Sequence, residues 1–320
     1  MLFKKKLLTN SWVVGILALV CCLLWGSAFP CVKLGYRMFH VEAVDWAGQI
    51  LFAGVRFAFA GVLVILIGSV ASKTILFPRR GIQFRHIMKL SLFQTILQYF
   101  FFYIGLARTS GVKASIIEGT NVFVAILVAA LCFRMEKVTR QKLWGCFLGF
   151  AGVVLVNASG TGMDWNMHWM GEGFIFLSTF AYAVSSVLLK RFSKEDSPLL
   201  LSGYQFLVGG LVMAAVGSLM GGKLSFAGAG IPEWWMLLYL ALISAVAYSL
   251  WGILLKYNDV SRVAVYGFMN PVFGVLLSAW LLEERELLGV HSLIALALVC
   301  MGIFFVNRKE LTGSIEEEGR

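Results

Sequence analysis

Two ionisable residues lie deep inside long apolar stretches of the sequence. Arg56 falls within residues 48–71, and Glu118 falls within residues 111–133. A charged side chain inside a lipid-embedded helix costs several kcal/mol, so each of the two is a candidate for function. At a rise of about 1.5 Å per residue, both lie ~10–12 Å below the membrane surface at which their stretches begin. Equal depth permits an ion pair between them.

The sequence leaves two roles open for this pair of charges. In the first, Arg56 and Glu118 form a fixed buried ion pair that locks their helices together. In the second, the Glu118 carboxylate receives a substrate amine or a proton, and the Arg56 guanidinium receives a substrate carboxylate. Asn121 follows Glu118 by three residues and therefore shares its helix face.

Other polar and aromatic residues recur at helical spacing near mid-depth. These stripes, with the aromatic residues expected at the outer vestibule, are Gln94 and Gln98; Tyr266 and Asn270; Ser244, Tyr248 and Trp251; and Trp25, Phe29, Tyr99 and Tyr103. One interpretation is hydrogen bonding between helices with small-residue packing. The other is a cavity lined by amides, hydroxyls and rings, suited to a zwitterionic or aromatic metabolite.

Pro271 interrupts the stretch 261–282. Proline has no backbone N–H, so it removes one hydrogen bond and frees a carbonyl about one turn earlier, near Gly267. The interruption could serve as a hinge or a ligand contact, or it could be a fixed kink.

Residue types that support metal, cofactor or enzyme chemistry are sparse. The six cysteines form no CxxC pair, and the four histidines are scattered. There is no GxxxxGK[ST] phosphate loop, so the chain is not expected to drive transport with nucleotide. A lone buried Glu without a second acid or a nucleophile–base pair argues against an intramembrane enzyme. We expect no metal and no cofactor.

The elements that must position these residues are membrane spans. The chain has 320 residues, of which 59% are hydrophobic and 14% charged, with a mean hydropathy of +0.83; a soluble domain carries about 25% charged residues. A span needs about 20 apolar residues. Ten stretches qualify: 12–33, 48–71, 87–108, 111–133, 139–157, 171–191, 199–220, 234–256, 261–282 and 287–307. The first is too long for the apolar region of a signal peptide, so we expect it to be retained.

Basic residues fall mainly on one side of these spans. Most of the 27 Lys and Arg lie in segments that share a side with the N-terminus. Cytoplasmic segments carry this excess, which predicts a multi-pass protein of the cell (inner) membrane with both termini in the cytoplasm. The net charge of +10 is then an orientation signal and predicts no nucleic-acid partner.

The two halves of the chain repeat. At a shift of 150 positions, Glu136 meets Glu286, Gly152 meets Gly302, and Asn157 meets Asn307. The repeat predicts one domain at 1–157 with five spans, a second at 171–307 with five more, and a disordered cytoplasmic tail at 308–320. Because five is odd, the second copy must be inverted relative to the first. Inverted repeats are typical of alternating access around a midplane site.

Four phrases, taken in order, resemble a known family. They are LLWGSAFPCVKLG, AGVRFAFAGVLVI, YIGLARTSGVKASII and MNPVFGVLLSAWLLEE. The chain resembles the drug/metabolite transporter superfamily in its EamA-type branch over roughly residues 12–307. It departs from that pattern at Asn121, which stands in the first copy where Pro271 stands in the second. The resemblance implies an all-α integral membrane fold, with ten helices as two inverted five-helix repeats around a central cavity.

The predicted function is secondary transport of small metabolites. We expect an exporter of amino acids or related zwitterionic or aromatic compounds. The alternative is a carrier of nucleotide sugars or lipid-linked sugars, and remoter alternatives are a membrane scaffold or an intramembrane enzyme. The expected partners are a small-molecule substrate and the lipid bilayer. Protons are one candidate coupling ion, and the oligomeric state is left open, with a monomer compatible with the sequence.

Overall fold

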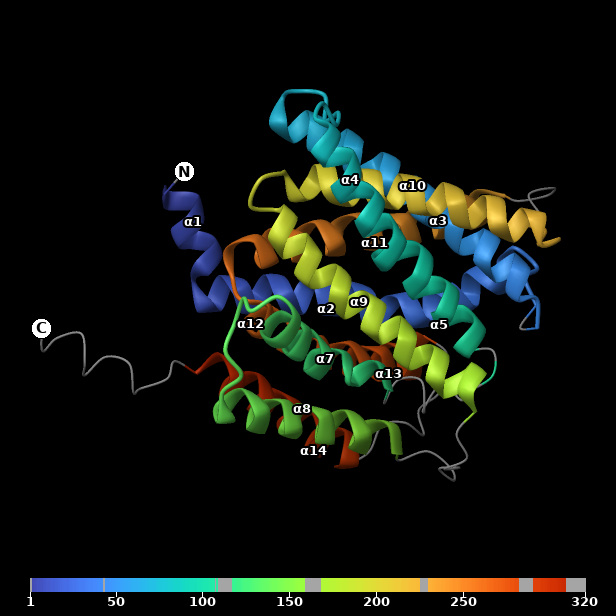
Figure 1. The fold of residues 1–320 in the computed structure, drawn as a ribbon. Coiled ribbons are helices and arrows are strands. Elements are labelled where there is room, and N and C mark those ends of the chain that lie inside the picture. The colour runs from blue at the N-terminus through green and yellow to red at the C-terminus, as the bar shows by residue number, and fades with distance from the viewer. Residues whose placement is uncertain are drawn as a thin grey trace, which may run out of the picture.

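The structure is a computed structural model, and it describes residues 2–42, 44–106, 108, 117–158, 168–224, 230–281 and 290–308. Within these ranges every regular element is a helix (Figure 1). The elements are α1 (Leu2–Thr9), α2 (Ser11–Met38), α3 (Trp46–Ser72), α4 (Gly81–Leu90), η1 (Ser91–Leu97), α5 (Gln98–Leu106), α7 (Asn121–Leu127), η2 (Val128–Cys132), α8 (Arg140–Ala158), η3 (Trp169–Gly173), α9 (Phe174–Phe192), α10 (Pro198–Leu219), α11 (Ile231–Tyr257), α12 (Val260–Ala264), η4 (Val265–Phe268), α13 (Met269–Leu281) and α14 (Val290–Asn307).

Within the described residues, each predicted span overlaps one of these helices or a run of them. Six runs are long and apolar enough to cross a membrane: Ser11–Met38, Trp46–Ser72, Gly81–Gly105, Trp169–Phe192, Pro198–Leu219 and Ile231–Tyr257. Two shorter apolar helices are Ile117–Cys132 and Leu293–Asn307. A bilayer offers no water to unpaired backbone groups, so an apolar stretch of this length satisfies them internally by forming a helix.

Local sequence signals set several helix ends. The Asn10 side chain accepts hydrogen bonds from the first backbone N–H groups of α2, at 2.9 Å from Trp12. Asp45 does the same for α3, accepting from Gly48 N at 2.8 Å. Such side chains satisfy N–H groups that have no partner in the first helical turn. Pro198 begins α10, where its missing N–H costs nothing.

Two pairs of helices pack antiparallel at very close range. Gly54 of α3 lies against the backbone of Ala214 in α10, and Gly61 of α3 lies against Gly203 and Leu207, which come earlier in α10. A Cβ atom at Gly54 would clash with this backbone, so only glycine permits the approach. α8 and α14 pair in the same antiparallel sense along the lower edge of Figure 1, with Gly145 facing the end of α14 and Gly152 facing its middle.

The remaining helices form two groups. In the first group, which we call group A, α5 and α7 pack on α9, and α4 and η1 lead into α5. In the second, group B, α11 and α13 pack on α2, and α12 and η4 lead into α13. α3 contacts both α11 of group B and α5 of group A. Helix α3 therefore bridges groups A and B, and a site between the two groups would be bordered by α3.

One end of the bundle carries both α1 and the C-terminal end of α14, and we call it the terminal face (Figure 1). Segments 133–139, 193–197 and 258–259 lie there as well, since Glu136 contacts Ser261, Asp196 contacts Lys256, and Asn258 contacts Leu8. The half of the bundle next to this face is filled by an apolar core to which all the long helices except α3 contribute.

Candidate functional site

A cavity of about 390 Å³ lies between groups A and B. Its lining residues are Trp25, Ala28, Val32, Tyr36, Gln49, Arg56, Gln98, Tyr99, Phe102, Tyr103, Glu118, Gly119, Asn121, Val122, Ser178, Thr179, Tyr182, Tyr248, Gly267, Asn270 and Pro271. Tyr36 and Gln49 lie at the ends of α2 and α3 that point away from the terminal face. The cavity therefore extends from mid-bundle toward the opposite face.

Arg56 reaches the cavity from α3. Its side chain is almost fully buried, at 5% exposed for the residue. The Nη2 atom donates to Ser244 Oγ of α11 at 3.0 Å, and the guanidinium carbon lies 4.7 Å from the centroid of the Phe57 ring. Nε has no hydrogen-bond partner in the described part of the chain. A buried donor without a partner is costly, so this atom is available to an acceptor in the cavity.

Glu118 reaches the same cavity from the other side, on the short helix that leads into α7 of group A. Among the ion pairs between described residues, none joins Glu118 to Arg56. The fixed ion pair allowed by their equal depth is therefore not formed in this conformation. Asn121 lines the cavity one turn after Glu118, and its buried Oδ1 has no partner within the described ranges.

The two helices that carry Asn121 and Asn270 are both irregular at this depth. The helix Ile117–Cys132, which contains Glu118, is irregular at Thr120, a turn residue immediately before Asn121, without any proline there. Its counterpart changes from α-helix to 3₁₀-helix at Val265–Phe268, shortly before Asn270 and Pro271. The two irregular segments are adjacent, because a Cβ on Gly267 would lie 3.8 Å from Val122. Interrupted helices at the midplane are typical of transporter binding sites.

Aromatic rings form the wall contributed by group B and α5. Trp25 packs edge-on against Tyr248 at 5.0 Å between ring centroids and against Trp251 at 4.9 Å. The hydroxyl of Tyr248 lies 2.8 Å from the hydroxyl of Tyr99. Trp25 Nε1 is buried with no hydrogen-bond partner among the described residues. The wall thus offers flat apolar surface together with a free donor.

Four of the predicted site residues do not line the cavity. Ser244 is fully buried and acts on the cavity through its hydrogen bond to Arg56. Trp251 lies behind Trp25. Gln94 lies in η1, which packs on α10. Tyr266 packs against Gly15 of α2. The other predicted residues line it: Trp25, Arg56, Gln98, Tyr99, Glu118, Asn121, Tyr248, Gly267, Asn270 and Pro271.

Several lining residues were not among the predicted site residues. Those with polar or aromatic side chains are Tyr36, Gln49, Phe102, Tyr103, Ser178, Thr179 and Tyr182, of which Tyr103 was expected only at the vestibule. A usable signal existed for Tyr182, since it meets Trp25 when the first span is shifted by 157 positions. Ser178 and Thr179 carry no such signal, because small hydroxyl residues are equally common at helix–helix contacts.

Comparison with known proteins places this geometry in a family. The model of the EamA-like transporter family matches residues 12–158 and again residues 169–308. The chain belongs to the EamA-like transporter family. It is therefore a multi-pass membrane protein of a transporter family, and the cavity is the candidate substrate-binding site.

Relatives of this EamA-like chain are also named as transporters. An uncharacterized transporter from Archaeoglobus fulgidus is 27% identical over 94% of this chain and 99% of its own length. The uncharacterized inner membrane transporter YedA from Escherichia coli is 25% identical over 92% of this chain and 93% of its own. A solved crystal structure superposes with a TM-score of 0.73 at 18% identity, covering 91% of this chain and 95% of that one. That likeness concerns the fold alone.

Proposed function

We propose that the protein is a secondary carrier for a compact zwitterionic metabolite, an amino acid or a related compound. The observation that carries this proposal is that one cavity holds a guanidinium and a carboxylate, neither of which forms an ion pair among the described residues. Arg56 enters from α3, and Glu118 enters from group A. Each charge is expensive to bury alone. A ligand with an ammonium and a carboxylate group would neutralise both at once.

The unsatisfied polar atoms of the cavity favour the same ligand. The donors are Arg56 Nε and Trp25 Nε1, which need an acceptor such as a carboxylate. The acceptors are the Oδ1 atoms of Asn121 and Asn270, in addition to the Glu118 carboxylate, and they need a donor such as an ammonium group. None of these four atoms has a partner among the described residues. Buried polar groups are normally satisfied, so a ligand or water would complete them.

Size and charge weigh against the alternative, a nucleotide sugar or lipid-linked sugar. The cavity of about 390 Å³ is near the lower end of the range of roughly 300–1,000 Å³ for ligand pockets. Among the described residues that line it, Arg56 is the one cation. A diphosphate would call for several cations. The aromatic wall, with Trp25 at its centre, suits a metabolite that carries an apolar or aromatic side chain.

We further propose that the chain forms ten spans as two inverted repeats, at residues 1–157 and 171–307. Two kinds of observation support this. The family model matches once in each half, and the repeat-related helices α3 and α10 pack antiparallel, as do α8 and α14. Equivalent helices of two inverted repeats run in opposite directions, so the antiparallel packing of these pairs agrees with an inverted repeat. Alternating access between the repeats is then the expected transport mechanism.

The proposed orientation places the terminal face, and with it both termini, in the cytoplasm of a cell with this protein in its inner membrane. Basic residues at that face support it, among them Arg80, Lys142, Lys190 and Arg262. The proposed cytoplasmic tail at 308–320 falls almost wholly outside the described residues. Export is the proposed direction, and protons are the first coupling ion to test, because Glu118 is a membrane-embedded carboxylate.

A binding screen with matched ligands tests the proposed substrate class. The thermal stability of the purified protein is measured with α-amino acids, with the corresponding carboxylic acids lacking the amine, and with the amines lacking the carboxylate. Stabilisation by the zwitterion is expected to exceed clearly that by either analogue, since a ligand that binds only the folded state raises its stability by an amount that increases with its affinity. Glu118→Gln and Arg56→Lys should each abolish the shift, and Gln94→Met, a change outside the cavity, should retain it. Stabilisation by nucleotide sugars and not by zwitterions would reject the proposal.

A further inference from the structure

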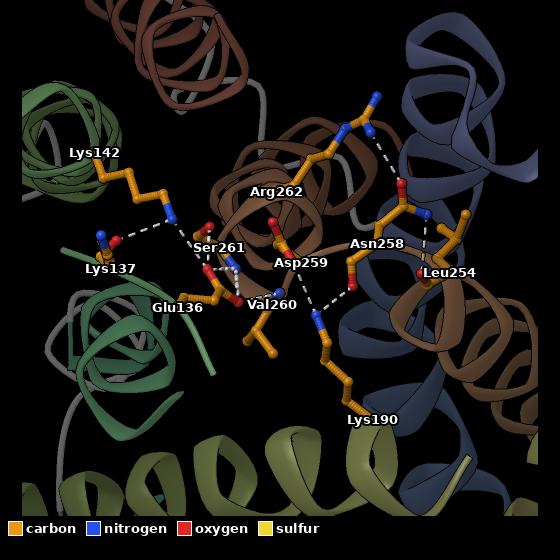
Figure 2. A network of polar contacts seen from close by, with 10 residues as sticks. All are labelled: Glu136, Lys137, Lys142, Lys190, Leu254, Asn258, Asp259, Val260, Ser261 and Arg262. Carbon is orange, nitrogen blue, oxygen red and sulfur yellow. Dashed lines mark hydrogen bonds and ion pairs between the residues drawn. The ribbon is translucent and has the colours of Figure 1, made fainter. Parts of the chain in front are cut away.

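The terminal face carries a dense polar cluster around residues 258–262, where α12 begins (Figure 2). Glu136, in the segment after η2, supplies its carboxylate to this cluster. The carboxylate accepts hydrogen bonds from the backbone N–H groups of Val260 and Ser261 and from the Ser261 hydroxyl at 2.5 Å. It also forms an ion pair with Lys142 at 3.1 Å. The Glu136 side chain is only 2% exposed.

The contacts in this cluster divide according to the helix groups that they join. Glu136 follows η2, which continues α7 of group A, and its partners Val260 and Ser261 belong to α12 of group B. Lys190 of α9, also in group A, donates to the carbonyl of Asn258 at 2.7 Å and pairs with Asp259 at 3.1 Å. These contacts cross from one group to the other at the terminal face.

Arg262 makes contacts of a different kind. Its Nη2 donates to the carbonyl of Thr9 at 3.1 Å and to Ser11 Oγ at 2.9 Å, and its Nη1 donates to Asn258 Oδ1 at 3.1 Å. Thr9 ends α1 and Ser11 begins α2, so these contacts remain within group B or join it to α1. Arg262 thus lies in the same polar cluster as Glu136 and is also hydrogen-bonded there. Its contacts with described residues do not join group A to group B.

Beneath the cluster, apolar side chains close the route to the cavity. Val187 of α9, Leu254 of α11 and Val263 of α12 are fully buried and belong to one continuous core. Cys22 of α2 is buried in the same core, and its thiol donates to the carbonyl of Tyr266 at 3.1 Å. For the cavity to open at this face, groups A and B must separate, which requires the contacts of Glu136 to break.

We infer that Glu136 is the latch that holds the cavity closed at the terminal face. Its carboxylate ties the end of one interrupted helix, which carries Asn121, to the start of the other, which carries Asn270. When the contacts of Glu136 with Val260 and Ser261 break, the two groups can part and the core beneath them can be hydrated. This positioning role rests on the proposed carrier function, since a latch is needed only where the closed face must later open.

The test uses Cys22 as a native reporter. In the full-length protein, the five other cysteines, at positions 21, 31, 132, 146 and 300, are replaced by alanine or serine. The rate at which a charged, water-soluble methanethiosulfonate modifies Cys22 is followed by intact mass. Glu136→Ala should raise this rate about tenfold or more, because loss of a charge-assisted contact shifts the equilibrium toward the open form. Glu136→Gln, which retains an acceptor oxygen, should give a smaller rise.

Arg262→Ala is the matched control, and its rate should stay within about twofold of the parent, since it breaks contacts within group B and to α1 but none with group A. Equal rates in Glu136→Ala and in the parent, or an equal rise in Arg262→Ala, would overturn the inference. If Glu136→Ala does not yield folded protein, Ser261→Ala provides the same comparison, and an unchanged rate in that variant would also overturn it. No substrate is used, so this outcome is independent of the zwitterion screen.

Discussion

The guanidinium of Arg56 donates from Nη2 to Ser244 Oγ at 3.0 Å, across the contact between α3 and α11. Ser244 is itself fully buried and donates to the Leu240 carbonyl at 3.4 Å. The hydroxyl therefore fixes the orientation in which Arg56 meets the cavity. Arginine recognises a carboxylate through two parallel N–H groups, so this orientation decides whether both can face the ligand.

Ser244→Ala is expected to weaken binding of ligands that carry a carboxylate. Loss of one hydrogen bond to a charged group costs about 1.5–3 kcal/mol, but Arg56 stays in place, so we expect a roughly tenfold higher Kd. The Kd is measured by thermal-shift titration with a zwitterion found in the screen. A decarboxylated analogue should bind equally well to both proteins. Equal loss for both ligands would show that Ser244 acts on stability alone.

Substitutions in the aromatic wall should separate stacking from hydrogen bonding. Trp25→Ala removes the ring that packs against Tyr248 at 5.0 Å and should raise the Kd for an aromatic zwitterion by about tenfold or more. Tyr248→Phe keeps its ring and removes only the hydroxyl 2.8 Å from Tyr99. We expect a change of about threefold or less for this variant, measured in the same titration. A larger rise in Kd for Tyr248→Phe than for Trp25→Ala would show that the hydroxyls of Tyr99 and Tyr248, and not the Trp25 ring, recognise the ligand.

Glycine at the contact between α3 and α10 is predicted to be indispensable. A Cβ atom at Gly210 would clash with the backbone of Ala58 and with Gly54. Gly210→Val should therefore lower the Tm sharply or prevent recovery of monodisperse protein, because overpacking costs about 1–3 kcal/mol or more. Gly81→Ala is the control, since a Cβ there meets no atom within 4 Å, and its Tm should not fall. An unchanged Tm in Gly210→Val would contradict the close packing.

We expect the contacts of the Asp196 carboxylate to stabilise the folded protein at neutral pH and to lose this effect in acid. Burial alone would raise its pKa, but hydrogen bonds from Gln83, His86 and Arg80 outweigh burial and hold the pKa below its usual value. A depressed folded-state pKa stabilises the folded protein above the unfolded-state pKa, and this stabilisation is lost as the pH falls through the folded-state value. We expect it to be complete at neutral pH and to decline below about pH 4.

Asp196→Asn tests this contribution by thermal unfolding across pH. At pH 7 the variant should be less stable than the parent by roughly 1–3 kcal/mol, and the difference should shrink as the pH falls below about 4. Arg262→Ala serves as a control that leaves the Asp196 contacts intact and should show a difference that does not follow this carboxyl titration. A pH-independent deficit in Asp196→Asn would assign the effect to packing.

Much of the candidate site could be predicted from the sequence. Arg56, Glu118 and Asn121 stand out because polar residues in apolar stretches are rare and costly, and all three line the cavity. Gln94 and Tyr266 satisfied the same criterion but point elsewhere. Depth can be counted along a helix, but the direction in which each side chain points depends on how the helix is rotated against its neighbours. A helix that is apolar on all sides gives no amphipathic signal for that rotation.

The sequence by itself determined the number of apolar stretches, their lengths and the family, because a bilayer compels an apolar stretch of sufficient length to form a helix. The tertiary structure alone decided three other matters. Among the described residues, Arg56 and Glu118 line the same cavity without forming an ion pair, Ser244 orients Arg56, and Glu136 joins the two helix groups at the terminal face. Each depends on contacts between residues more than 60 positions apart, and these arise only when packing fixes the rotation and spacing of whole helices.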